Sequence, residues 1–127
     1  MNRLKILKEN GHMIPVILEV PENGDSVVIM VHGFTSSKEC PTGQLLLRRM
    51  PEAGIGVVLY DQPGHGEEEA KEDPFRIENC MDSLAAVEKY VQLKWPEKEI
   101  FYFASSYGAY LTGLYLERRK HAGTHLL

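Results

Sequence analysis

The residues most suited to chemistry are two adjacent serines, Ser105 and Ser106, which follow an apolar run. A serine at a sharp turn from a strand into a helix can act as a nucleophile. It then needs small residues two positions before and after it, because larger side chains would clash there. Ala104 and Gly108 satisfy this condition for Ser106. Ser105 fails it, because Tyr107 would occupy the second small position. The spacing therefore favours Ser106 as a nucleophile over the simpler interpretation, a serine that caps a helix.

A second segment suited to chemistry, residues 32–35 with the sequence His-Gly-Phe-Thr, follows an earlier apolar run. Acyl transfer to a serine needs hydrogen-bond donors for the oxygen that becomes negative in the tetrahedral intermediate. The N–H of Tyr107, directly after the candidate nucleophile, is one expected donor, and the N–H of Phe34 is the other. An ordinary tight turn at His32 and Gly33 is the alternative. The position of the segment after a strand that precedes the serine favours an oxyanion hole.

A third segment, residues 61–66 with the sequence Asp-Gln-Pro-Gly-His-Gly, follows the middle apolar run. Its two glycines and its proline require a specific backbone path. Asp61 as a catalytic acid and His65 as a base for Ser106 are alternatives that stay open. The favoured interpretation is that both side chains order a loop at the border of the site.

The pattern of apolar residues predicts which elements position these three segments. Continuous apolar runs without alternation are typical of buried parallel strands, whereas three- and four-residue steps indicate helices. Asp73 is expected to cap the second helix, with Pro74 at its first position. Asn-Gly at positions 10 and 11 predicts a type I′ hairpin turn. The expected parallel strands are residues 27–31, 56–60 and 100–104, the helices 44–50, 74–95 and 106–120, and the hairpin strands 4–7 and 13–20.

This order predicts an α/β fold with a mainly parallel sheet, an N-terminal β-hairpin and helices on both faces. Ligands bind beyond the carboxyl ends of the strands in such sheets, where the three segments lie. The acidic run at residues 67–72 is expected to be a solvated loop.

The composition excludes several classes of function. With 14 basic and 18 acidic residues among 127, the net charge of -4 disfavours a nucleic-acid or anionic-membrane surface. The longest apolar run, residues 27–31, is too short to span a bilayer, and no secretory signal is recognisable. Cys40 and Cys80 stand apart and fit no metal-ligand spacing, so we expect reduced thiols in a cytoplasmic protein without metal or cofactor.

Residues 31–34, 61–66 and 104–108, in this order, resemble the N-terminal half of the α/β-hydrolase superfamily. The His-Gly-Phe-Thr segment is especially similar to bacterial esterases of the cinnamoyl/feruloyl type and to their serine aminopeptidase-like relatives. The resemblance implies hydrolysis of carboxylic esters or thioesters, with Ser106 as the nucleophile and the N–H groups of Phe34 and Tyr107 as the oxyanion hole. A small-molecule substrate is therefore expected.

In that superfamily the catalytic acid and histidine follow the serine along the chain. No position after Ser106 fits them, since His121 and His125 are expected at the opposite edge of the sheet. The resemblance thus implies that residues 1–127 form one partial domain, truncated after the helix that follows the nucleophile and inactive by itself. The alternative is a non-catalytic protein that keeps the scaffold for binding or oligomerisation. The strand at residues 100–104 would then be an exposed edge available for self-association.

Overall fold

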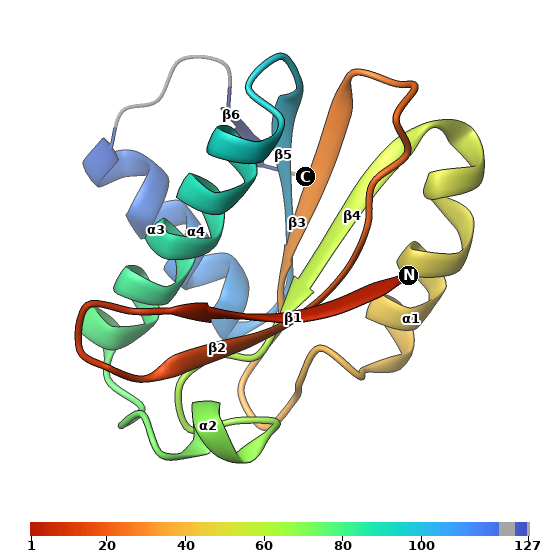
Figure 1. Cartoon of the computed structure of the whole chain (residues 1–127). Helices are drawn as coiled ribbons and strands as arrows, with labels where there is room; N and C mark the ends of the chain where they lie inside the picture. Colours follow the sequence, from red (N-terminus) through yellow and green to blue (C-terminus); the bar gives the residue numbers. More distant parts are fainter. Residues whose placement is uncertain (120–123, 127) are drawn as a thin grey trace.

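The computed structural model describes residues 1–119 and 124–126, and its strands form one sheet in the order β1-β2-β4-β3-β5-β6 (Figure 1). β3 pairs in parallel with β4 and β5, and β5 pairs in parallel with β6. The antiparallel hairpin of β1 and β2 extends the sheet beyond β4. The sequence-based prediction of a mainly parallel sheet with an N-terminal hairpin is confirmed. The strands are β1 (Asn2–Leu7), β2 (Met13–Glu19), β3 (Ser26–Val31), β4 (Ile55–Tyr60), β5 (Glu99–Ala104) and β6 (Thr124–Leu126).

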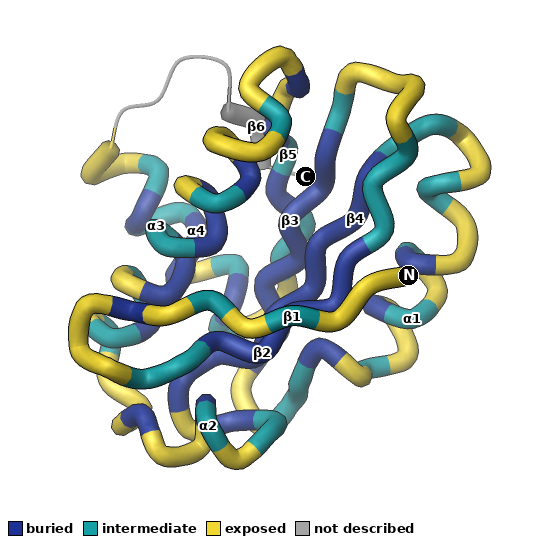
Figure 2. The backbone as a smooth tube through the Cα atoms, in the orientation of Figure 1, coloured by how far each residue is buried: buried dark blue, intermediate teal, exposed yellow. Residues whose placement is uncertain are grey.

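Helices cover both faces of this sheet. α3 and α4 lie on one face and α1 on the other (Figure 1). The central strands β3 and β4 are buried over almost their whole length (Figure 2). The core under α3 and α4 is larger than the core under α1, which is formed by Ile17, Met30, Leu47, Val57 and Leu59. The helices are α1 (Pro41–Arg49), the 3-10 helix η1 (Pro51–Ala53), α2 (Glu68–Lys71), α3 (Ile77–Lys94) and α4 (Tyr107–Arg119).

The hairpin turn differs from the predicted type I′ turn. Gly11 has a φ of 90°, but Asn10 does not have a positive φ. The N–H of Gly11 donates to the carbonyl oxygen of Lys8 at 3.0 Å, and the N–H of Lys8 donates to that of His12 at 2.9 Å. These bonds define a three-residue loop that closes on a left-handed glycine, the second common way to build a hairpin.

Asp73 does not cap the second predicted helix, and Pro74 is not its first residue. α3 begins at Ile77, after the extended Arg76. The carboxylate of Asp73 is buried and instead pairs with the ammonium group of Lys8. A buried lysine needs a carboxylate partner, and this tertiary requirement outweighs the local preference for a cap. The acidic run also departs from the prediction, since α2 forms within it.

β5 is not the exposed edge that the sequence predicted. Ile100, Phe101 and Tyr102 pair with Thr124, His125 and Leu126 of β6. The chain therefore returns after α4 and adds a short parallel strand. Only the part of β5 after Tyr102, where the pairing with β6 ends, could form the predicted exposed edge. His125 lies in the amino half of the sheet, as expected, and His121 lies outside the described residues.

Candidate active site

Ser106 occupies the turn between β5 and α4, and its backbone has a φ of 56°. Serine rarely adopts this left-handed conformation, which persists only where the surrounding structure imposes it. Thr35 is the other described non-glycine residue with a positive φ, at 65°. Ser105 does not share this conformation. Both serines are exposed, so the strained turn presents the side chain of Ser106 at the carboxyl edge of the sheet.

Two glycines allow this turn to lie close to β3. A Cβ atom on Gly108 would overlap the carbonyl oxygens of Val31 and His32. A Cβ atom on Gly33 would lie 3.0 Å from the Cβ and 3.5 Å from the Oγ of Ser106. The first turn of α4 and the loop after β3 therefore pack backbone against backbone. The small residue that the sequence motif requires after the serine has a direct steric reason.

The two predicted oxyanion donors have no partner within residues 1–119. Neither the N–H of Phe34 nor the N–H of Tyr107 donates to another described protein group. Tyr107 is the first residue of α4, where the helix dipole favours negative charge. Phe34 directly follows Gly33, which packs on Ser106. The loop and the helix start thus offer free N–H groups next to an exposed hydroxyl.

The family model described as "Serine aminopeptidase, S33" matches residues 22–126. The chain belongs to this family of hydrolases. A comparison with curated protein sequences gives no match.

Solved structures show the α/β-hydrolase fold. A thermostable carboxyl esterase from Bacillus coagulans is 21% identical with a TM-score of 0.82, over 98% of this chain and 43% of that chain. A dienelactone hydrolase from Anabaena variabilis is 18% identical with a TM-score of 0.77, over 97% and 59%. Est1E from Butyrivibrio proteoclasticus, with ferulic acid bound, is 20% identical with a TM-score of 0.78, over 92% and 48%. The chain thus spans about half the length of these relatives.

Neither histidine at this edge of the hydrolase sheet is hydrogen-bonded to Ser106. The Nε2 of His65 accepts the N–H of Thr35 at 3.0 Å, and its Nδ1 lies 2.9 Å from the carbonyl oxygen of Pro63. Both ring nitrogens of His32 are likewise hydrogen-bonded within the two loops that follow β3 and β4. Both rings are buried. The arrangement therefore favours structural roles over a dyad of His65 and Ser106.

Asp61 belongs to a buried ion pair that ties the two loops together. Its carboxylate accepts the ammonium group of Lys38 at 2.7 Å and the backbone N–H groups of Lys38 and Glu67 at 2.9 and 3.0 Å. The side chains of Lys38 and Asp61 are 1% and 0% exposed. Burial by itself would lower the pKa of Lys38, but the hydrogen bonds to Asp61 and Glu67 outweigh it and raise this pKa. Sequence reasoning missed Lys38, because a single lysine in a loop carries no pattern.

Aromatic rings border one side of the sharp turn at Ser106 between β5 and α4, which is called the elbow below. Phe34 stacks on Phe75 with ring centroids 5.5 Å apart, and Phe75 contacts Tyr107 edge-on at 5.3 Å. Tyr107 in turn contacts the exposed Tyr110 at 6.3 Å. Phe34 is 59% exposed. An apolar part of a ligand could therefore rest beside Ser106.

A second buried network lies behind the elbow and joins α3, β5 and α4. The carboxylate of Glu88 accepts the hydroxyl groups of Tyr102 and Tyr115, the latter at 2.8 Å, and pairs with Arg119 at 2.5 Å. Burial, followed by the hydrogen bond to Glu88, raises the pKa of both tyrosines. Because Tyr102 lies in β5 and Tyr115 in α4, this network fixes the two elements that meet at Ser106. The pattern of apolar residues in the sequence of α3 does not indicate that Glu88 is buried.

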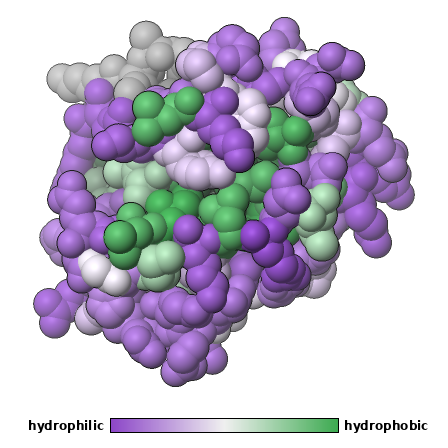
Figure 3. Space-filling model, in the orientation of Figure 1, coloured by the Kyte–Doolittle hydropathy of each residue, from purple (hydrophilic) through white to green (hydrophobic). Residues whose placement is uncertain are grey.

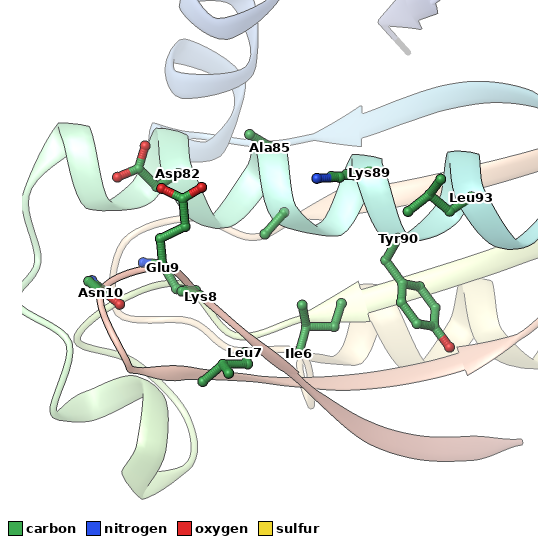
Figure 4. A pocket seen from close by; sticks show the side chains of 11 residues that line it. Ile6, Leu7, Lys8, Glu9, Asn10, Asp82, Ala85, Lys89, Tyr90 and Leu93 are labelled. Carbon is green, nitrogen blue, oxygen red and sulfur yellow. The ribbon is translucent and has the colours of Figure 1, made fainter.

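A hollow of about 440 Å³ lies elsewhere, between β1 and α3. Apolar side chains gather in this region of the surface (Figure 3). Ile6 and Tyr90 come from its two walls, and Glu9 and Asp82 lie at one end (Figure 4). None of its lining residues belongs to the loops around Ser106. Within residues 1–119, no helix is long and apolar enough to cross a membrane.

Proposed function

We propose that this hydrolase cleaves carboxylic esters or thioesters of small molecules, with Ser106 as the nucleophile. The observation that carries the proposal is the left-handed backbone of Ser106 in a turn packed against β3 through Gly33 and Gly108. Such strain at an exposed serine costs free energy, and strained residues of this kind cluster at functional sites. The aromatic rings beside the serine support a substrate with an apolar group.

In the proposed reaction the Oγ of Ser106 forms a bond to the acyl carbon, and the carbonyl oxygen becomes negative. The N–H groups of Phe34 and Tyr107 bind this oxyanion. The bond to the alcohol or thiol leaving group then breaks, and water releases the acyl group from the serine. No metal or cofactor takes part in this scheme.

The hydroxyl proton must pass to a base, which then gives it to the departing alcohol or thiol. Because His32 and His65 are committed to the loops, we propose that a histidine and a carboxylate outside residues 1–127 complete the site. The chain would then be the nucleophile-bearing part of a larger hydrolase domain. A cytoplasmic location stays a prediction, which fractionation of the native host would check.

A cysteine at position 106 tests the nucleophile without the external base, since a thiol near a helix start ionises more readily than a hydroxyl. Ser106→Cys should be acylated by p-nitrophenyl acetate much faster than the matched Ser105→Cys. Peptide mapping separates the new thiol from Cys40 and Cys80. Equal acylation at positions 105 and 106 would contradict the proposed site.

The unmodified chain provides a second test. It should react only slowly with a fluorophosphonate, and the residual label should sit on Ser106 and disappear in Ser106→Ala. Labelling at the rate of complete serine hydrolases would show that the chain contains its own base and would overturn the proposed external histidine.

The alternative function is a non-catalytic scaffold that binds a partner or self-associates. The apolar hollow between β1 and α3, remote from Ser106, is the observation that favours it. A stable dimer in analytical ultracentrifugation, weakened by Leu7→Asp or Leu93→Asp, would support this function. A monomer with a reactive Ser106→Cys would contradict it.

A further inference from the structure

His32 and His65 join the two loops by a reciprocal exchange of hydrogen bonds. His32 follows β3, and its Nε2 accepts the N–H of Gln62 in the loop after β4 at 3.0 Å. His65 lies in that second loop, and its Nε2 accepts the N–H of Thr35 in the first loop at 3.0 Å. The two ring centroids are 5.3 Å apart. Each loop therefore supplies the acceptor for a backbone donor of the other.

The partners of the two rings are compatible with one protonation state. The Nδ1 of His32 lies 2.8 Å from the carbonyl oxygen of Gly33, and the Nδ1 of His65 lies 2.9 Å from that of Pro63. A carbonyl oxygen requires a donor, so Nδ1 carries the proton in both rings. A backbone N–H requires an acceptor, so Nε2 carries none. Both imidazoles must be neutral for the exchange to hold.

These bonds hold the peptide groups that surround the predicted oxyanion donor. The carbonyl oxygen of Gly33 accepts both the Nδ1–H of His32 and the N–H of Ser36, the latter at 3.2 Å. In a trans peptide the N–H points opposite to the carbonyl group, so this anchoring directs the N–H of Phe34 away from His32. The next peptide is fixed by the bond from Thr35 to His65. Thr35 has a φ of 65°, so the loop needs such a restraint.

We propose that His32 and His65 are positioning residues that aim the N–H of Phe34 at the substrate oxyanion, and that they do so as neutral imidazoles. This inference rests on the proposed function of Ser106. Protonation of either ring would set an N–H donor against a backbone N–H donor and release the loop. The site should therefore lose its oxyanion hole in acid, independently of the base that activates the nucleophile.

The surroundings of His32 favour its neutral state. His32 and His65 are 2% and 8% exposed. Burial is the main cause that lowers the pKa of His32, the hydrogen bond to the carbonyl oxygen of Gly33 opposes it, and the charges of a protonated His65 and of Lys38 lower this pKa further. Asp61 opposes them, but its carboxylate is already bound to Lys38. The aromatic rings of Phe34 and Phe75 cover His65.

The test compares two reactions of the thiol in Ser106→Cys. Acylation by p-nitrophenyl acetate passes through an oxyanion, whereas alkylation by iodoacetamide does not. The ratio of the acylation rate to the alkylation rate does not depend on how far the thiol is ionised. The ratio therefore measures the contribution of the oxyanion hole. Adding His65→Leu should lower this ratio about tenfold or more, since loss of one oxyanion donor costs roughly a hundredfold in rate. His65→Gln, whose amide oxygen can accept the N–H of Thr35, should restore most of it.

The pH profile provides a second measurement if His65→Leu fails to fold. The ratio in Ser106→Cys should fall in acid, because a protonated ring can no longer accept its backbone N–H, and His65→Gln should reduce this fall. An unchanged ratio in folded His65→Leu, or the same pH profile in His65→Gln, would overturn the inference. If Ser106→Cys shows no advantage over Ser105→Cys in acylation, the proposed function fails instead.

Discussion

Two buried polar networks flank the nucleophile strand, and they are built differently. In front of Ser106, the network of His32, His65, Lys38 and Asp61 binds mainly backbone N–H and carbonyl groups of two loops. Behind it, the carboxylate of Glu88 in α3 binds side chains of two other packed elements, β5 and α4. The front network shapes a backbone path, whereas the rear network joins elements that are already regular. We therefore expect damage in front to alter the site and damage behind to alter mainly stability.

Gly108 packs against the backbone of Val31 and His32, and its replacement should have the largest effect. In Gly108→Val the new side chain would overlap the carbonyl oxygens of Val31 and His32, which cannot move without shifting β3. We expect destabilisation beyond about 4–5 kcal/mol, seen as an unfolded or insoluble product. Circular dichroism and solubility measure this outcome.

Gly113 supplies the matched control in the same helix. Apart from its chain neighbours and the backbone of its own helix, no described atom lies within 4 Å of a Cβ atom placed there. Gly113→Ala should stabilise the protein by roughly 0.5–1 kcal/mol, because alanine favours a helix over glycine. A folded, stable Gly108→Val would show that the elbow does not depend on this close approach.

The sequence predicted the turn at Ser106 and the mainly parallel sheet because both leave local marks. Ala104 and Gly108 identify the serine, and three apolar runs identify the parallel strands. The partners of buried charges leave no such marks. Asp73 looks like a helix cap in sequence and is a partner of Lys8 in space, and Lys38 and Glu88 carry no local signal at all. Long-range pairing decided each of these positions.

Lys38→Met should break the front network and cost stability as well. It would leave the carboxylate of Asp61 buried with its two backbone donors but without a counter-charge. We expect a loss near the lower end of the roughly 3–5 kcal/mol that follows removal of one partner of a buried pair. Urea denaturation measures the loss. The ratio of acylation to alkylation in Ser106→Cys should also fall, because Lys38 lies in the loop that holds Phe34.

Lys5→Met is the exposed counterpart of this variant. The side chains of Lys5 and Glu69 are 42% and 38% exposed, so removal of this pair should change the stability little. If both variants lose the same stability, burial of Lys38 and Asp61 does not set their importance.

Glu88→Gln should separate the rear network from the site. One amide oxygen replaces a carboxylate that accepts two buried tyrosine hydroxyls, so one donor loses a good acceptor at a cost of about 1–3 kcal/mol. The ratio of acylation to alkylation in Ser106→Cys should remain unchanged. Glu117→Gln, at an exposed position of α4, is the control for the loss of one negative charge. A changed ratio would mean that the rear network also positions the nucleophile.

Acid should lower the free energy of unfolding through the front network, and this effect should be the smallest of those predicted. The pKa of His32 is lowered from 6.5 in the folded chain, chiefly by burial, so the folded state resists a proton that the unfolded state accepts. The contribution of His32 to stability is therefore fully present above pH 6.5 and is lost progressively as pH falls toward the folded pKa. Urea denaturation between about pH 8 and pH 5 measures the slope. His32→Gln should flatten it, whereas His12→Gln in the hairpin should not. If the stability of the two variants depends on pH with the same slope, the neutral imidazole of His32 does not support the loop. The front and rear networks would then differ in position but not in how their stability depends on pH.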